Sequence, residues 1–137
     1  FVGLDFEFLE ADYASVCAVG LVVVENGQIV DTYETLVKPK TLHQGYYQYR
    51  AHHITINQLK NAPTWTEIFP TLEKLIGDSP IVCYNQTAEK GGLEGCAEQF
   101  GTRCDFGFID AYQMACVYHE SRISRKSGYG AFCAQGP

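Results

Sequence analysis

The feature that most constrains this chain is its first apolar run, Val2–Phe8, which holds two carboxylates, Asp5 and Glu7. Such a run predicts a buried strand, and on a strand residues i and i+2 point to the same face. The two acids would therefore lie side by side and repel each other, and a divalent cation would offset that repulsion. The alternative is an ordinary strand end at which both acids face water.

Two further strands are expected directly after the first. Residues 15–24 are rich in β-branched side chains, and residues 29–37 alternate in polarity, so both ranges predict strands. Between them lies Asn26-Gly27, a dipeptide that strongly favours a tight hairpin turn. Three strands connected in this way form an antiparallel meander.

The remainder of the chain predicts helices alternating with short strands. Residues 41–62 are expected to be mostly irregular, with a short helix from Thr55 to Leu59. The other expected elements are helices from Thr64 to Ile76, Asn85 to Phe100 and Asp110 to about Tyr118, and strands over 81–84 and 106–109. This order predicts an α/β domain with one mixed five-stranded sheet (three antiparallel strands, then β-α alternation) flanked by helices.

Ligands in such sheets gather at the strand ends. The predicted topology therefore places four polar side chains near one edge of the sheet: Asp5, Glu7, Asn85 and Asp110. This is the first support for a functional site around the two acids.

The composition is that of a single folded domain. Of the 137 residues, 46% are hydrophobic and 19% are charged, which are ordinary values for a globular protein. The net charge of −6 argues against a protein that coats nucleic acid by charge alone. It is compatible with an enzyme whose acids are neutralised by bound cations.

The sequence contains no apolar run of membrane-spanning length and no recognisable signal peptide. The six cysteines form no C-x-x-C pair and have no zinc-site spacing. We therefore expect a cytoplasmic protein that does not insert in a membrane, with its thiols reduced.

An ordered set of motifs covers essentially the whole chain: Phe1–Glu7, Ala51–Thr55, Ile81–Glu89 and Phe108–Asp110. Together they resemble the DnaQ-like 3′–5′ exonucleases, which are DEDD-type nucleases of the ribonuclease H-like fold. The resemblance implies a ribonuclease H-like sheet and a single exonuclease domain over residues 1–137.

The resemblance also implies a two-metal site. Asp5 would bridge two Mg²⁺ or Mn²⁺ ions, Glu7 would hold one and position the attacking water, and Glu89 would complete the site. The family usually has Asp at the position of Glu89, and a solvated helix acid is the alternative interpretation of this residue. The family's final motif, His-x-x-x-x-Asp, does not occur here, so we expect the domain to continue beyond residue 137; the alternative is that the protein lacks this motif.

Further site residues follow from the same resemblance. Phe8 and Leu9 would lie against the last base and sugar, His52 would contact the terminal nucleotide, and Asn85 is the polar residue of the second motif. The alternatives are core packing for Phe8, an exposed loop position for His52 and a helix cap for Asn85. Asp110 is expected as a helix N-cap close to the site.

Three tyrosines, Tyr46, Tyr47 and Tyr49, lie close together in the expected loop. They would either stack on single-stranded bases or pack within the loop.

These observations predict a metal-dependent 3′–5′ exonuclease that acts on single-stranded DNA or RNA ends, with a DNA polymerase subunit as a further expected partner. One alternative is a catalytically impaired family member that serves as a nucleic-acid- or polymerase-binding module. Another is a ribonuclease H-like endonuclease, and a third is a plain α/β interaction domain.

Overall fold

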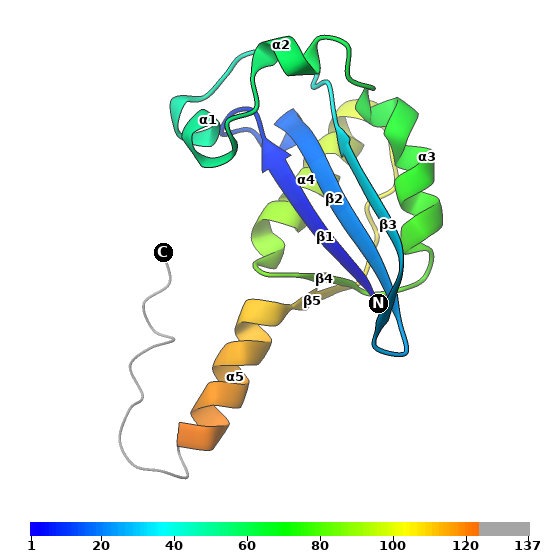
Figure 1. Cartoon of the computed structure of the whole chain (residues 1–137), viewed down its shortest axis with the longest axis vertical. Helices are drawn as coiled ribbons and strands as arrows, with labels where there is room; N and C mark the ends of the chain where they lie inside the picture. The colour runs from blue at the N-terminus through cyan, green and yellow to red at the C-terminus, as the bar shows by residue number, and fades with distance from the viewer. Residues whose placement is uncertain (124–137) are drawn as a thin grey trace.

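A computed structural model describes residues 1–123, which form one five-stranded sheet with its main helices packed against it (Figure 1). The strands lie in the order β3-β2-β1-β4-β5. Their bounds are β1 (Val2–Phe8), β2 (Val16–Glu25), β3 (Gln28–Leu36), β4 (Ile81–Cys83) and β5 (Phe108–Asp110). The first three strands are antiparallel, and β4 and β5 run parallel to β1. The predicted mixed sheet is therefore confirmed.

The hairpin between β2 and β3 has the predicted turn. Asn26 has φ 50° and Gly27 has φ 77°. Positive φ at both central positions is the geometry of a two-residue turn whose twist matches the flanking strands.

The helices are η1 (Tyr13–Ser15), α1 (Tyr46–His52), α2 (Ile56–Leu59), α3 (Trp65–Ile76), α4 (Gln86–Phe100) and α5 (Ala111–Ile123). Helices α2 and α3 begin at capping boxes, in which Thr55 pairs with Gln58 and Thr64 with Glu67. Helix α3 continues through Pro70. None of the helices within residues 1–123 is long and apolar enough to cross a bilayer.

Helix α1 corrects the expectation of an irregular segment over 41–62. None of its residues is buried, so the sequence carries no apolar stripe at helical spacing. The helix ends at His53, whose φ of 57° is left-handed and whose N–H donates to the carbonyl of Tyr49. Two smaller corrections concern β5, which begins at Phe108 instead of residue 106, and α5, which extends to Ile123.

The main core lies on one face of the sheet, beneath α3 and α4. Alternate residues of β1 (Val2, Leu4 and Phe6) are buried there, together with Trp65 and Leu72 of α3. The residues between them, including Asp5 and Glu7, consequently point to the opposite face, as the two-residue period requires.

Helix α4 contains glycines that permit a close approach to η1. A Cβ at Gly95 would lie 2.9 Å from the backbone nitrogen of Ala14, and one at Gly91 would lie 2.8 Å from the ring of Tyr13. The low helix propensity of these glycines is thus offset by contact with the segment that follows β1.

The cysteines within the described residues are free thiols, as predicted: Cys17, Cys83, Cys96, Cys104 and Cys116. Cys133 lies outside the described residues.

Candidate active site

Asp5 and Glu7 lie on the same face of β1, as predicted. Asp5 pairs with Gly20 and Glu7 with Ala18 across the β1–β2 ladder, so both acids are flanked by small residues. The ladder shifts register between Glu7 and Phe8. This bulge skips Cys17 of β2, so that Phe8, directly after the second acid, pairs with Val16.

Glu89 lies in the first turn of α4 and is 5% exposed, which is unusual for a carboxylate. Its Oε2 atom is buried and has no hydrogen-bond partner in the described part of the chain. Burial raises the pKa of Glu89, and the negative charge of Asp5 raises that pKa further. The charge of Asp5 thus acts on Glu89, although the two residues are distant in the sequence.

Cys83, the last residue of β4, lies beside this pair, and the sequence did not suggest it. Burial raises the pKa of its thiol to about 12, and the negative charges of Glu89, Asp110 and Asp5 act in the same direction. The thiol therefore stays protonated. No residue pattern around position 83 could have indicated this contact.

Asp110 links the starts of two helices behind the acids. It pairs with Cys83 in the sheet, and its Oδ2 accepts from the backbone nitrogen of Gln86, at 3.2 Å. Its Oδ1 accepts from the backbone nitrogen of Gln113, at 2.9 Å. The predicted cap of α5 is therefore present, and the same carboxylate also holds the first residue of α4.

Asn85 caps α4, as the alternative interpretation predicted. Its side-chain oxygen accepts from the backbone nitrogen of Thr87, at 3.1 Å, and the residue is exposed. Asn85 thus fixes the start of the helix that carries Glu89.

The residues after Glu7 turn back sharply through η1. Leu9 is fully buried beside Cys17 and Leu59, and both of its backbone groups are bonded, to Ser15 and Gly45. The Leu9 side chain is therefore part of the core and does not reach an accessible surface.

The ring of Phe8 packs edge-on between Phe6 and Tyr13. Phe8 also lies close to α4, because a Cβ on Gly92 would come within 3.2 Å of its ring. Phe8 therefore serves partly as packing, although it also lines a pocket beside Glu7.

His52 fastens the end of α1 to the end of β1. Its Nδ1 accepts from the backbone nitrogen of Ile54 at 2.9 Å, and its Nε2 lies 3.0 Å from the carbonyl oxygen of Phe8. Because Nδ1 is an acceptor, Nε2 carries the proton and donates to Phe8. Both ring nitrogens are thus engaged within the protein.

A pocket of about 270 Å³ opens beside Glu7. Its lining comes from the end of β1, the segment before η1 and the inner side of α1: Glu7, Phe8, Glu10, Ala11, Tyr13, Gln48, Ala51 and His52. One of the two β1 acids is therefore directly accessible from a concave surface.

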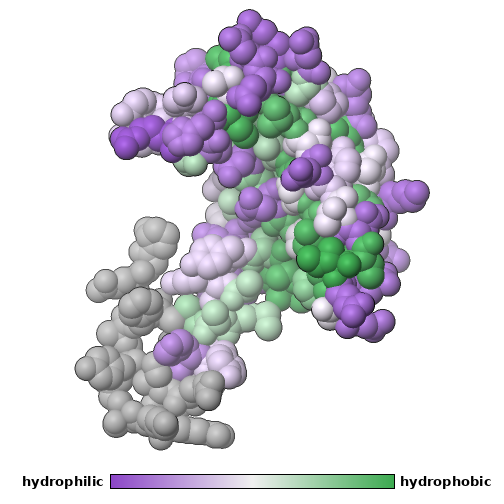
Figure 2. Space-filling view, viewed as in Figure 1, coloured by the Kyte–Doolittle hydropathy of each residue, from purple (hydrophilic) through white to green (hydrophobic). Residues whose placement is uncertain are grey.

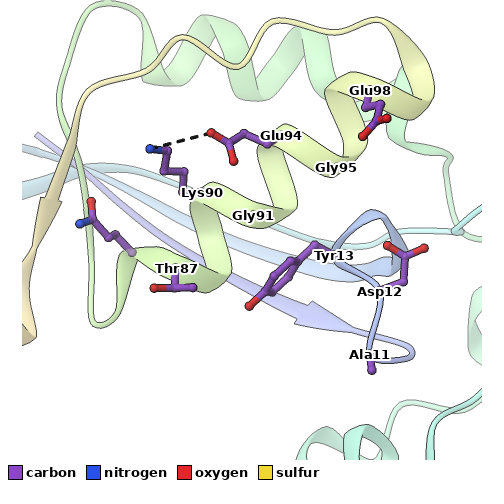
Figure 3. A pocket seen from close by; sticks show the side chains of 10 residues that line it. Ala11, Asp12, Tyr13, Thr87, Lys90, Gly91, Glu94, Gly95 and Glu98 are labelled. Carbon is purple, nitrogen blue, oxygen red and sulfur yellow. Dashed lines mark ion pairs between the residues drawn. The ribbon is translucent and has the colours of Figure 1, made fainter. Parts of the chain in front are cut away.

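A second, wider pocket of about 700 Å³ lies on the other side of Tyr13, between η1 and α4. Figure 3 shows Tyr13 extending from the η1 segment toward α4, with Gly91 and Gly95 on the adjacent helix face. Its charged groups are mainly acidic: Asp12, Glu94 and Glu98, with Lys90 paired to Glu94 at 3.9 Å. Tyr13 thus lines both pockets, the smaller one beside Glu7 and the wider one between η1 and α4.

The sequence model of the RNase_T exonuclease family matches residues 2–89, which is more than half of the chain. The chain belongs to this exonuclease family. The matched segment begins with β1 and ends at Glu89, so it contains all three candidate site acids.

A curated relative supports the same assignment for this RNase_T domain. The "DNA polymerase III PolC-type" protein of Clostridium perfringens is 30% identical over 97 residues, which cover 71% of this chain. The chain spans only 7% of that polymerase. Family and relative together identify a DnaQ-like exonuclease domain.

Solved exonuclease structures share the fold. Exonuclease X in complex with 5′ overhanging duplex DNA aligns with TM-score 0.65 and 17% identity, over 94% of this chain and 67% of its own. The nuclease domain of 3′hExo bound to rAMP gives 0.68 and 13%, over 88% and 70%. Exonuclease I of E. coli in complex with a 5cy-dA13 oligonucleotide gives 0.75 and 11%, over 90% and 30%. These likenesses show that the RNase_T domain has the predicted ribonuclease H-like fold.

The site chemistry of the RNase_T domain fits a divalent cation in some respects. Carboxylate oxygens are the ligands that Mg²⁺ and Mn²⁺ prefer, and the unpartnered Oε2 of Glu89 is a buried acceptor beside a second acid. Within residues 1–123, however, no three acidic, His or Cys side chains are close enough together to form a ready-made metal site. The acids thus have the donor type that these ions prefer, but within residues 1–123 they are not gathered around one point.

Proposed function

We propose that this domain is a metal-dependent 3′–5′ exonuclease that removes nucleotides from single-stranded DNA or RNA ends. The observation that carries the proposal is the buried Oε2 atom of Glu89, which has no hydrogen-bond partner within the described residues, on a carboxylate whose pKa the charge of Asp5 raises. Family membership supplies the reaction class, since the matched segment contains both residues.

Three acids would hold the ions: Asp5 and Glu7 from β1 and Glu89 from α4. When bound, two divalent ions supply an activated water and stabilise charge on the leaving oxygen. Asp5 would supply a ligand between the other two acids, because its charge acts on Glu89 and it shares a strand face with Glu7. Glu7 reaches the pocket and would orient the attacking water there.

The pocket beside Glu7 suits the terminal nucleotide. Its volume of about 270 Å³ is just below the range of roughly 300–1,000 Å³ typical of small-ligand sites. Phe8 would contact the last nucleotide from the pocket, and Asn85 would contact it from the start of α4. His52 and Leu9 would support that contact from behind, by holding the backbone of residues 8–10 in place.

The likeness to a PolC-type polymerase makes a replicative DNA polymerase the proposed protein partner. The exonuclease would then act on the strand end that the polymerase produces. Several structural neighbours named as 3′-exonucleases support the proposed direction of attack.

The test is degradation of single-stranded DNA and RNA labelled at the 5′ end, incubated with full-length protein and Mn²⁺. We expect a ladder that shortens from the 3′ end. In Asp5→Ala the rate should fall by more than about 100-fold, because loss of even an outer-shell residue typically costs 10–100-fold. Glu25→Ala, which removes an exposed acid at the far hairpin, is the matched control and should retain the wild-type rate.

Other outcomes separate the alternatives. Internal cuts in a circular single strand would indicate an endonuclease. Binding of single strands without cleavage, together with no heat of Mn²⁺ binding in calorimetry, would indicate a binding module and contradict the proposal.

A further inference from the structure

Helix α1 presents an exposed stripe of aromatic and cationic side chains. Tyr46 is 66% exposed and Tyr47 is 80% exposed, although large aromatic residues are usually buried. Arg50 lies over the Tyr46 ring, with its guanidinium carbon 5.8 Å from the ring centre, and the Tyr46 and Tyr47 rings meet edge to face. Tyr49 forms a similar contact with His53. The rings are therefore held by contacts with one another and with Arg50, while the Tyr46 and Tyr47 side chains stay largely exposed to solvent.

The segment that contains this stripe has a charge opposite to that of the rest of the chain. Residues 35–66 contain none of the sixteen acidic residues of the protein, but they hold four of its ten basic residues and three of its four histidines. The basic residues are Lys38, Lys40, Arg50 and Lys60. Figure 2 shows a hydrophilic surface over the α1–α2 region and a notch between α1 and α5. A segment with an excess of basic residues in an acidic protein favours contact with a polyanion.

This basic segment is fastened to the strand that carries the acids. The Gly45 nitrogen donates to the carbonyl of Leu9 at 2.8 Å, and His52 contacts the carbonyl of Phe8 at 3.0 Å. His43 pairs with Glu10 at 3.1 Å. Residues 45 and 52 thus fix both ends of α1 against the chain that directly follows Glu7.

The other path away from the acids is unsuited to phosphates. The groove between η1 and α4 carries three carboxylates, and its single lysine is already paired with one of them. A strand leaving the pocket beside Glu7 would be repelled along that groove and attracted along α1.

From these contacts we infer that the exposed face of α1, formed by Tyr46, Tyr47 and Arg50, is a stacking platform for the single-stranded nucleic acid upstream of the scissile end. The bases stack on the tyrosines and Arg50 contacts the backbone, as in other sequence-independent single-strand sites. This inference rests on the proposed function, which it deepens by making the enzyme prefer an unpaired strand that extends beyond the last nucleotide.

The test measures binding of a fluorescent oligothymidylate of about 16 nucleotides, near the upper limit for a single-strand groove. Full-length protein carrying Asp5→Ala is used, so that no cleavage occurs. Adding Tyr46→Ala and Tyr47→Ala should weaken binding by at least about 10-fold. The matching Tyr→Phe pair should bind like the parent, because stacking needs the ring and not the hydroxyl. Arg50→Gln should lower the slope of log K against log salt by about 0.7.

Two controls test whether the effect is local. Ile29→Ala removes another exposed hydrophobic side chain, on β3, and Lys74→Gln removes an exposed charge on α3. Both should leave binding and its salt slope unchanged. Equal binding by the Tyr→Ala pair and the parent would overturn the platform, and so would equal losses in the Ala and Phe pairs.

A second readout separates this inference from the proposed function. In protein with Asp5 intact, the Tyr→Ala pair should slow cleavage of the long strand by at least about 10-fold more than cleavage of a dinucleotide. Equal slowing of both substrates would contradict the platform while the exonuclease proposal stands. Absence of cleavage of either substrate by unmodified protein would contradict the exonuclease, and the binding experiment would still decide the platform.

Discussion

Glu89 holds a carboxylate oxygen in a place where neither water nor a hydrogen-bond donor of the described residues reaches it. A buried charge in this position destabilises the fold unless a proton or a cation neutralises it. Burial and the nearby charge of Asp5 both favour the proton, which is why the pKa of Glu89 is raised. A proton and a metal ion would therefore compete for the Glu89 carboxylate, and the raised pKa favours the proton.

The pH dependence of stability follows from this raised pKa. Because the folded state binds the Glu89 proton more tightly than the unfolded state does, rising pH should lower stability from about pH 4.5 upward, through the raised pKa. Glu89→Gln should remove this part of the pH slope and be more stable than the wild type at pH 7 in EDTA. Urea unfolding between pH 4 and 8 would measure both. Glu94→Gln, an exposed neighbour on α4, should keep the wild-type slope, and an identical slope in Glu89→Gln would refute the argument.

At this scale the sequence predicts some side-chain positions and misses others. The shared face of Asp5 and Glu7 follows from the period of a strand alone. The burial of Glu89 does not follow from the sequence, because its neighbours Lys90 and Glu94 are typical of a solvated helix. The depth of Glu89 depends on how closely α4 approaches β1, which is a property of packing between distant segments.

The contact between α4 and η1 determines how closely α4 approaches β1. Gly91 and Gly95 leave no side chain between the helix and the segment that follows β1. On the other side of this contact, the Ser15 hydroxyl donates to the carbonyls of Glu10 and Asp12 and stabilises the turn. The position of Glu89 on α4 thus depends on the shape of the turn that follows Asp5 and Glu7 on β1.

Replacement of Gly95 tests this dependence. Alanine in a helix interior normally gains roughly 1 kcal/mol over glycine. In Gly95→Ala the new methyl would meet backbone at 2.9 Å, so the net change should be a loss of about 1–3 kcal/mol in the free energy of unfolding. Gly20→Ala, whose methyl would meet no atom within 4 Å, should be close to neutral. A Gly95→Ala protein that is more stable than the wild type would contradict this prediction, and would show that η1 shifts readily to accommodate the new methyl group.

Helix α1 illustrates what the sequence could not predict among the elements. Its residues are aromatic and polar without an apolar stripe, because the helix packs by its ends and by hydrogen bonds from Gly45 and His52. Helix α3, by contrast, was predicted correctly because its buried side chains recur at helical spacing, from Trp65 to Ile76. Hydrogen bonds between distant segments produce no periodic pattern in a sequence.

For the whole molecule, the candidate metal ligands belong to two parts of the fold. Asp5 and Glu7 come from the first strand, and Glu89 comes from a helix that follows β4. An ion held by both parts binds the folded chain and has no equivalent site in the unfolded one.

Divalent cations should therefore stabilise the whole domain. At a Mn²⁺ concentration 100 times the dissociation constant, we expect a gain of about 2.7 kcal/mol in the free energy of unfolding. Thermal or urea unfolding with and without Mn²⁺ would show it. The gain should vanish in Asp5→Ala and persist in Glu25→Ala. An equal gain in all three proteins would mean that the ion binds elsewhere.

The glycines of α4 also bear on the order in which the molecule assembles. A helix with three glycines within five residues nucleates poorly on its own, so α4 gains its helical structure mainly by docking on β1 and η1. The meander of β1, β2 and β3, by contrast, is closed by a short local turn. We expect Glu89 to take up its position after Asp5 and Glu7 are fixed on β1. The repulsion between Glu89 and these carboxylates would then arise only after the rest of the fold has formed.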